Sequence, residues 1–73
     1  MANNEVGTFT FESNVMQKTI NLQESYTNQI VVKLTPTKNI SVYLTDVQNS
    51  YFIVEKNTNE ELEVNYIVIE SES

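Results

Sequence analysis

The sequence predicts an all-β fold, a small antiparallel six-stranded β-sandwich, and three observations support this prediction. Apolar and polar side chains alternate at a spacing of two along nearly the whole chain, as in strands with one buried face. β-branched and aromatic residues are well represented, and short polar turns separate the alternating stretches. Strands joined at regular spacing by such turns favour a sandwich or barrel over a helical fold.

Three strands are expected in the first half of the chain. Ser13 and Asn14 form the first turn, and the polar loop 23–28, which carries Tyr26, forms the second. Lys18 interrupts an apolar face, where its aliphatic stem can pack while its ammonium reaches solvent. Pro36 should end the third strand, because it has no N–H for the ladder. The predicted strands, with their inward residues, are 6–12 (Phe9, Phe11), 15–22 (Met16, Ile20, Leu22) and 29–35 (Ile30, Val32, Leu34).

Three further strands follow in the second half. Polar segments at 37–39, 48–50 and 57–60 supply the turns before and between them. Their alternation places apolar residues on one face of each strand. The predicted strands, with their inward residues, are 40–47 (Ile40, Val42, Leu44), 51–56 (Phe52, Val54) and 61–70 (Leu62, Val64, Tyr66, Val68).

The predicted domain is too small to be stabilised easily by its own core. The 73 residues form one unit, expected at 7–70 between an N-terminal arm at 1–6 and a flexible tail at 71–73. Such domains bury only roughly 60% of their unfolded surface and usually depend on disulfides, metals or partner subunits. The chain has no Cys and no His, so partner subunits remain. Apolar residues on the second face of several strands favour an oligomer: Val31, Tyr43, Val47, Ile53, Ile67 and Ile69.

The composition also argues against several function classes. Without Cys or His, the chain lacks thiolate nucleophiles, imidazole bases and the usual ligands of zinc, copper, haem and iron–sulfur groups, so no cofactor is expected. A formal charge of −6, with four Lys and no Arg, opposes binding to nucleic acid. No apolar run is long enough for membrane insertion and the N-terminus lacks signal-peptide features, so we expect a soluble chain made in the cytoplasm.

Carboxylates are the main catalytic groups left, chiefly Glu60, Glu61 and Glu63. A glycosidase needs two carboxyl groups held across a cleft, and so small a sandwich leaves little room for one. The oxygen-rich segment 57–61 lacks the alternating Asp pattern and turn glycine of a calcium loop. We interpret these charges as solvated, and we expect no enzymatic activity, no catalytic residue and no metal site.

Tyrosines are the side chains best suited to contact a partner. Tyr66 shares the inward face of its strand and is assigned to the core. Tyr26, on a loop, and Tyr43 and Tyr51, on outer faces, can act as interface anchors or stack on the apolar face of a sugar. The candidate interface or glycan contacts are therefore Tyr26, Tyr43, Tyr51, Ile53, Ile67 and Ile69.

Six short motifs follow one another along the chain: GTFTF at 7–11, KTINL at 18–22, IVVKLTP at 30–36, ISVYL at 40–44, YFIVE at 51–55 and VNYIVI at 64–69. Together they resemble the small six-stranded β-sandwich at the receptor-binding tips of phage tail fibres and the related H-type lectin domains. That family has a Gly-led first strand, a strand ending in Thr-Pro, a strand of the form aromatic-x-Val and a last strand ending near an aromatic-Ile pair. The resemblance extends from about Gly7 to Ile69.

This resemblance implies a homotrimer packed around a three-fold axis and a place on the virion. The family unit usually lies at the end of a long fibre, whereas here only the segment 1–6 precedes the first motif. We therefore expect a capsid decoration or auxiliary protein, or a separately encoded head-fibre knob, with other virion proteins of the capsid or fibre as partners. The alternative is a lectin-like tail-fibre tip that binds host surface glycans.

Overall fold

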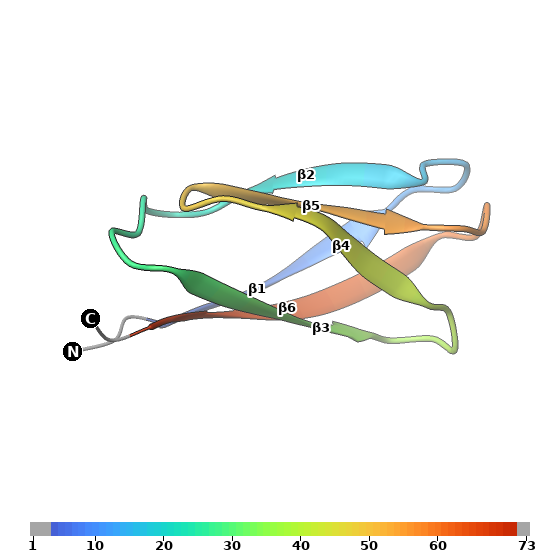
Figure 1. Cartoon of the computed structure of the whole chain (residues 1–73). Coiled ribbons are helices and arrows are strands. Elements are labelled where there is room, and N and C mark those ends of the chain that lie inside the picture. The colour runs from blue at the N-terminus through green and yellow to red at the C-terminus, as the bar shows by residue number, and fades with distance from the viewer. Residues whose placement is uncertain (1–3, 72–73) are drawn as a thin grey trace.

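Six antiparallel strands form two three-stranded sheets in the computed structural model, which describes residues 4–71 (Figure 1). Sheet A has the strand order β1-β6-β3, and sheet B has the order β2-β5-β4. The described residues contain no helix. The predicted class, an all-β fold of six antiparallel strands, is confirmed. The strands are β1 (Asn4–Phe11), β2 (Gln17–Asn21), β3 (Ile30–Pro36), β4 (Val42–Val47), β5 (Tyr51–Lys56) and β6 (Leu62–Glu70).

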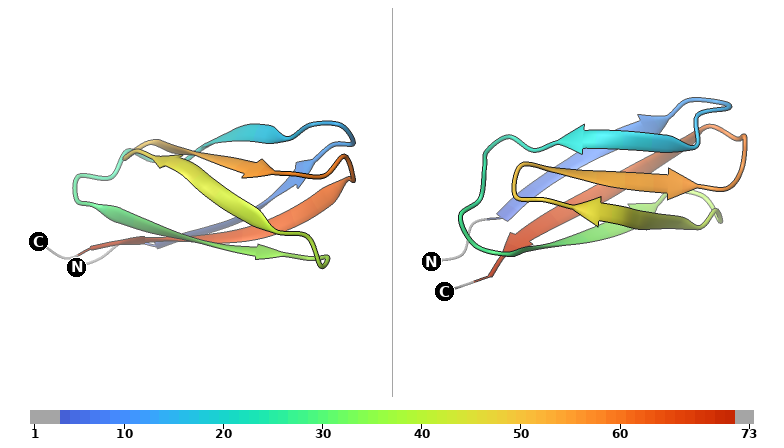
Figure 2. Two further views of the ribbon diagram at one scale, coloured as in Figure 1. Left: turned by 45° about the vertical axis from the view of Figure 1, so that its right-hand side comes forward. Right: turned by 45° about the horizontal axis from the view of Figure 1, so that its top comes forward.

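The chain crosses repeatedly between the two sheets (Figure 2). The connections β1–β2, β2–β3, β3–β4 and β5–β6 each join different sheets, whereas β4 and β5 are neighbours in sheet B. Crossing loops therefore lie at both ends of the sandwich. One end, called the terminal end, holds the start of β1, the end of β6 and the loop 22–29; the opposite end holds the loops 12–16, 37–41 and 57–61.

Aromatic rings from both sheets fill the centre of the core. The ring of Phe52 lies 5.3 Å from that of Tyr66 and 6.2 Å from that of Phe9, and Phe9 lies 5.6 Å from Phe11. These pairs meet edge to face, a geometry that the charge distribution of aromatic rings favours. The aliphatic residues Val54, Leu62, Val64 and Val68 are fully buried around them.

Close packing explains why Gly7 opens the first motif. Gly7 lies opposite Tyr66 in the ladder between β1 and β6, and the Tyr66 ring covers it. A Cβ atom at this position would lie 2.6 Å from the ring carbon Cζ. Any side chain here would displace the ring, so Gly7 is required for space rather than for an unusual backbone angle.

The inward pattern of the strands agrees with prediction in most places. β6 alternates strictly, and its residues Leu62, Val64, Tyr66 and Val68 are buried. β5 has the predicted bounds and buries Phe52 and Val54. In β2, Lys18 and Ile20 face inward as predicted, but Met16 was assigned wrongly. Met16 is exposed and precedes β2, while the adjacent Val15 packs against the core.

A β-bulge changes the phase of β4. The register shifts between Leu44 and Asp46, so that Thr45 is an extra residue opposite β5. Val47 then lies opposite Phe52 and packs against the core. The prediction that Val47 belongs to the outer face is wrong, because the bulge reverses the alternation after Leu44.

The boundaries at the chain ends also differ from prediction. β1 begins at Asn4, so Asn4, Glu5 and Val6 pair with β6 instead of belonging to an arm. The rest of the predicted arm, residues 1–3, lies outside the described residues. Ser71 donates its N–H to the Gln29 carbonyl oxygen at 2.8 Å, and the remainder of the predicted tail, 72–73, also lies outside them. β3 includes Pro36 as its last residue instead of ending before it.

Candidate functional site

Four apolar side chains form an exposed surface on the outer face of sheet A, which we call the sheet A patch: Val6, Val31, Ile67 and Ile69. Their exposed fractions run from 69% for Val6 to 38% for Ile69. On the central strand β6, Ile67 lies opposite Val6 of β1, and Ile69 lies opposite Val31 of β3. Because cross-strand partners on one face have Cβ atoms about 5 Å apart, the four side chains form one surface across all three strands.

The rest of this outer face is polar. Thr8 donates its hydroxyl hydrogen to the Asn65 Oδ1 atom at 2.7 Å, and Thr35 lies opposite Asn65 on the other side. Lys33 lies opposite Ile67 on the edge strand β3. The apolar surface is thus confined to the half of sheet A nearest the terminal end.

The outer face of sheet B has a different character. Tyr43 is exposed and donates its hydroxyl hydrogen to Glu55 Oε1 at 3.3 Å. Gln17 donates to the other oxygen of the same carboxylate at 2.8 Å. Tyr51 and Ile53 are half-buried on this face, where polar β2 residues pair with them. This surface combines aromatic rings with amide, hydroxyl and carboxylate groups.

The candidate contact residues therefore divide between two opposite faces. Ile67 and Ile69 belong to the sheet A patch, whereas Tyr43, Tyr51 and Ile53 lie on the outer face of sheet B. No single surface brings the two groups together.

Tyr26 was assigned wrongly as a surface contact. It does lie in the loop between β2 and β3, but its side chain is only 4% exposed and belongs to the core. The loop folds inward because its backbone is held on sheet B: Tyr26 donates its N–H to the Asn49 carbonyl oxygen at 2.9 Å. Tyr66 is buried as predicted.

A buried carboxylate explains where the Tyr26 ring goes. Glu5, 7% exposed, accepts hydrogen bonds from the Tyr26 hydroxyl at 3.0 Å and from the Tyr66 hydroxyl at 3.3 Å. Its two oxygens also accept the Gln23 N–H at 3.1 and 3.2 Å. Burial, together with the adjacent Glu5 carboxylate, raises the pKa of Tyr26 to about 12 and also raises the pKa of Tyr66 above its usual value.

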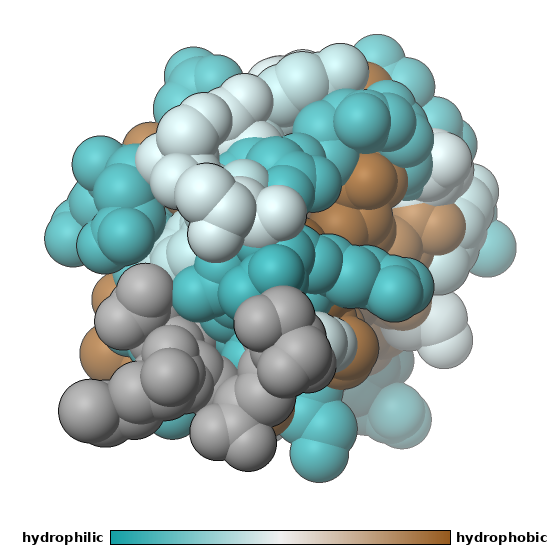
Figure 3. Space-filling model, turned by 60° about the vertical axis from the view of Figure 1, so that its left-hand side comes forward, coloured by the Kyte–Doolittle hydropathy of each residue, from teal (hydrophilic) through white to brown (hydrophobic). Residues whose placement is uncertain are grey.

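A second buried carboxylate holds the same loop. One oxygen of Glu70 accepts the N–H groups of Thr27 at 3.1 Å and Asn28 at 3.0 Å, and the Thr27 hydroxyl at 3.4 Å. The surface at this end is largely hydrophilic (Figure 3). Together, Glu5 and Glu70 fix the crossing loop to sheet A by accepting its main-chain hydrogens.

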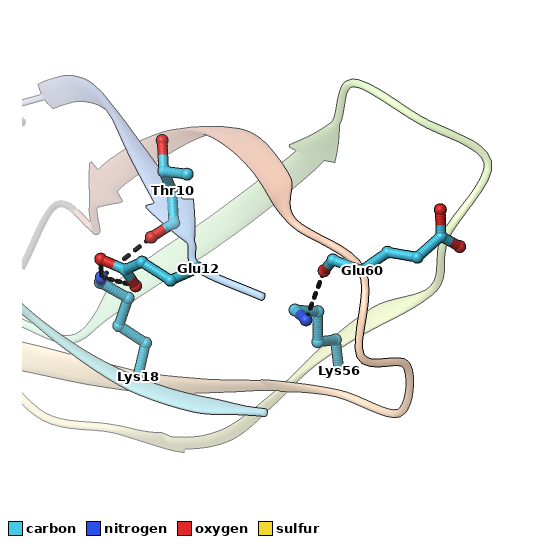
Figure 4. Close-up of polar contacts among 5 residues, drawn as sticks. All are labelled: Thr10, Glu12, Lys18, Lys56 and Glu60. Carbon is cyan, nitrogen blue, oxygen red and sulfur yellow. Dashed lines mark hydrogen bonds and ion pairs between the residues drawn. The ribbon is translucent and has the colours of Figure 1, made fainter. Parts of the chain in front are cut away.

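Two lysines donate to main-chain carbonyl oxygens at the opposite end, Lys56 to a crossing loop and Lys18 to strand β1 (Figure 4). Lys56, 2% exposed, donates to the carbonyl oxygens of Thr58 at 2.9 Å and Glu60 at 2.6 Å, and its Nζ atom lies 5.3 Å from the centre of the Phe11 ring. Lys18 donates to the Thr10 carbonyl oxygen at 2.9 Å and forms an ion pair with Glu12 at 3.0 Å.

The buried charged residues were not predicted as a group, although the sequence contains a signal for them. Glu5 is in phase with Phe9 and Phe11, Lys56 is in phase with the inward residues of β5, and Glu70 is in phase with those of β6. A charged residue that continues an inward phase at a strand end is therefore a candidate for a loop anchor.

The predicted solvated carboxylates Glu60, Glu61 and Glu63 are all exposed. Within residues 4–71, no pocket and no cluster of three or more potential metal-binding side chains is found. The same range contains no helix long and apolar enough to cross a membrane. The surface features that remain as candidates are the two outer faces and the free strand edges.

Fold and surfaces define an all-β sandwich with one apolar and one tyrosine-bearing outer face. Comparison with protein-family models, curated proteins and solved structures gives no match.

Proposed function

We propose that this protein is a non-enzymatic structural component of a bacteriophage particle, a capsid decoration or head-fibre knob that assembles as a homotrimer through the sheet A patch. The observation that carries the proposal is the patch itself, which spans all three strands of one sheet. Two further features support it: the motif resemblance between Gly7 and Ile69, and the lack of carboxylates in the patch, although the chain carries a net charge of −6.

The energetics favour covering this surface. Burying a Val or Ile side chain contributes about 1.5–3 kcal/mol, and a typical domain is stable by only about 5–15 kcal/mol. Covering even part of the sheet A patch therefore adds an appreciable fraction of the stability of a 73-residue chain. A three-fold arrangement covers all three patches at once.

The solution mass tests this assembly. Light scattering at low micromolar concentration should give three times the 8.4 kDa mass of the chain. The variant Ile67→Lys should give a folded monomer, because it places a charge in the centre of the patch. The matched control Ile53→Lys, on the outer face of sheet B, should keep the oligomer. A folded wild-type monomer at all concentrations would overturn the proposed assembly.

The particle location needs a separate measurement. Mass spectrometry of purified particles of the phage that encodes the chain should detect it at a constant ratio to the major capsid protein. Its absence from particles that infect normally would contradict a structural role, whatever the solution mass.

The outer face of sheet B favours a second candidate, a lectin-like domain that binds host surface glycans. Tyr43 is exposed beside the Glu55 carboxylate and the Gln17 amide, and a sugar can use an aromatic ring together with such polar groups. A glycan array should give a signal that Tyr43→Ala removes and that Ile67→Lys leaves unchanged. An array without signal would reject this candidate.

A further inference from the structure

We infer that the free edge of β1 is a second self-association site, where β1 of one copy pairs antiparallel with β1 of another copy around a two-fold axis at Val6. The contact uses main-chain groups along the edge of β1, and Val6 is the residue that it shares with the sheet A patch. It joins two copies of sheet A into one six-stranded sheet and does not rest on the proposed role in a phage particle.

The hydrogen bonds of the structure fix which main-chain groups face this edge. The Glu63 carbonyl oxygen accepts from the Thr37 N–H at 3.0 Å, so the main chain of Glu63 is directed towards β3 and away from β1. Thr10, which lies opposite Glu63, is therefore directed away from β6, and its carbonyl oxygen accepts from Lys18. Because main-chain direction alternates in an antiparallel strand, Asn4, Val6 and Thr8 share the direction of Thr10.

Their N–H and C=O groups therefore face outward along the edge of the sheet. Among the described residues, no hydrogen bond to the main chain of Asn4, Val6 or Thr8 is found outside the ladder with β6, the one strand that pairs with β1. Val6 is also the most exposed of the large apolar residues, at 69%. Unpaired groups repeated every second residue are a template for another extended strand.

The other three edges carry features that oppose such pairing. β4 contains the bulge at Thr45, and β3 ends in Pro36 and carries the outward Lys33. β2 has the inward-facing Lys18, which covers the β1 edge at Thr10. Bulges, prolines and charged residues are the means by which strand edges avoid pairing. The segment from Asn4 to Thr8 has no bulge and no proline, and its one charged residue, Glu5, is buried.

The edge is complementary to itself. A two-fold axis at Val6 places Val6 opposite Val6 of the second copy. It also places Asn4 of each copy opposite Thr8 of the other copy, which gives two such pairs. Each of these three pairs has its main-chain groups directed at the partner, so each exchanges two hydrogen bonds. Two valines meet on the outer face and each amide side chain meets a hydroxyl, so no charge is opposed to a like charge.

Charge favours a second copy of this segment despite the net charge of −6 on each chain. The one carboxylate in the pairing segment, Glu5, is turned into the core, where it accepts hydrogen bonds from Tyr26, Tyr66 and Gln23. The side chains left on the outer face of the segment are uncharged. Two chains that repel each other over most of their surface can therefore approach along this edge.

Amide hydrogen exchange measured by NMR tests the pairing residue by residue. The N–H groups of Gly7 and Phe9 are directed at β6 and should be protected at every concentration. The N–H groups of Val6 and Thr8 should exchange freely in dilute protein and slow by about tenfold or more near 1 mM, as the edge becomes paired. Unchanged fast exchange at Val6 and Thr8 over this range would overturn the inference.

A matched pair of variants identifies the main chain as the cause. Val6→Pro removes an N–H that β6 does not use, at an edge position where proline is tolerated, and should abolish the slowing at Thr8 while Gly7 and Phe9 stay protected. Val6→Thr keeps the N–H and should retain the slowing. Slowing that survives in the proline variant would exclude the pairing through Val6.

A mixture of two isotope-labelled samples gives a second measurement that needs no variant. The proposed register places Glu5 opposite Gly7 of the other copy in a non-hydrogen-bonded pair, so their Hα atoms should give an intermolecular contact. An oligomer that Ile67→Lys dissociates, with fast Val6 and Thr8 exchange and no such contact, would reject the edge pairing and leave the proposed assembly intact. Slow exchange at Val6 and Thr8 in a chain that forms no trimer would support the edge pairing and reject the proposed assembly.

Discussion

The two ends of the sandwich hold their crossing loops with opposite charges. At the terminal end, the carboxylates of Glu5 and Glu70 accept main-chain N–H groups of the loop 22–29. At the opposite end, Lys56 donates to two main-chain carbonyl oxygens of the loop 57–61, and Lys18 donates to the Thr10 carbonyl oxygen near the end of β1. The difference arises because the loop 22–29 turns N–H groups inward, whereas the loop 57–61 turns carbonyl groups inward.

These charged side chains explain how a chain with one Gly and one Pro crosses between its two sheets four times. A loop that passes over the end of a sandwich leaves peptide groups without ladder partners, and an unpaired buried group costs about 1–3 kcal/mol. One long charged side chain that satisfies one or two of them replaces a specialised turn. Among the described residues, no buried side-chain N or O atom lacks a hydrogen bond.

Substitution of Glu5, at the terminal end, should reduce stability more than substitution of either lysine at the opposite end. Glu5→Leu leaves the hydroxyls of Tyr26 and Tyr66 and the Gln23 N–H without their acceptor, so we expect a loss of about 3 kcal/mol in the free energy of unfolding. Urea denaturation measures the loss. Glu24→Leu, at an exposed position of the same loop, is the control and should change little. A Glu5→Leu variant as stable as the wild type would show that the terminal end does not depend on its carboxylate.

Substitution of Lys56 tests the opposite end. Lys56→Met keeps a long stem over the Phe11 ring and removes the donor to the Thr58 and Glu60 carbonyl oxygens. Because the loop 57–61 can turn a carbonyl group towards solvent, we expect a smaller loss of about 2 kcal/mol, again by urea denaturation. A loss greater than that of Glu5→Leu would reverse the ranking of the two ends.

Alkaline pH should weaken the terminal end of the unsubstituted protein, because Tyr26 lies there. The unfolded chain releases the tyrosine proton near pH 10, whereas the folded chain holds the proton of Tyr26 up to a pKa of about 12. The folded state thus binds more protons in this interval, and stability is full below pH 10 and falls as the pH rises to about 12. Absorbance titration and urea denaturation should agree on this window. Tyr26→Phe should weaken the pH dependence.

The sequence predicted the strands better than it predicted the loop anchors. Strict alternation in β5 and β6 was sufficient to place Phe52 and Tyr66 in the core, because period two leaves only one choice of face. Val47 was misplaced because a bulge adds one residue without a distinctive sequence signal. Tyr26 was misplaced because a polar loop gives no indication that a distant carboxylate, on β1, will accept its hydroxyl.

The candidate site could be predicted only in part, because it depends on the order of the strands in sheet A. Ile67 and Ile69 follow from the second phase of β6, so their exposure on the outer face was readable from alternation. Their contact with Val6 and Val31 depends on β6 lying between β1 and β3, and alternation carries no information on strand order. The free edge of β1 depends on the same order and on which residues face β6.

The smallest effect is expected at the ion pair between Lys18 and Glu12, which lies on the surface of the lysine-bearing end. The hydrogen bond from Lys18 lowers the pKa of the Glu12 carboxyl below its usual value. Lys18→Met should return this pKa towards the usual value in an NMR titration of the side-chain carboxyl carbon. Exposed ion pairs contribute little to stability, so Glu12→Gln should leave the urea midpoint nearly unchanged. A marked loss in Glu12→Gln would mean that this end, unlike the terminal end, depends on a surface charge to keep Lys18 on the edge of β1.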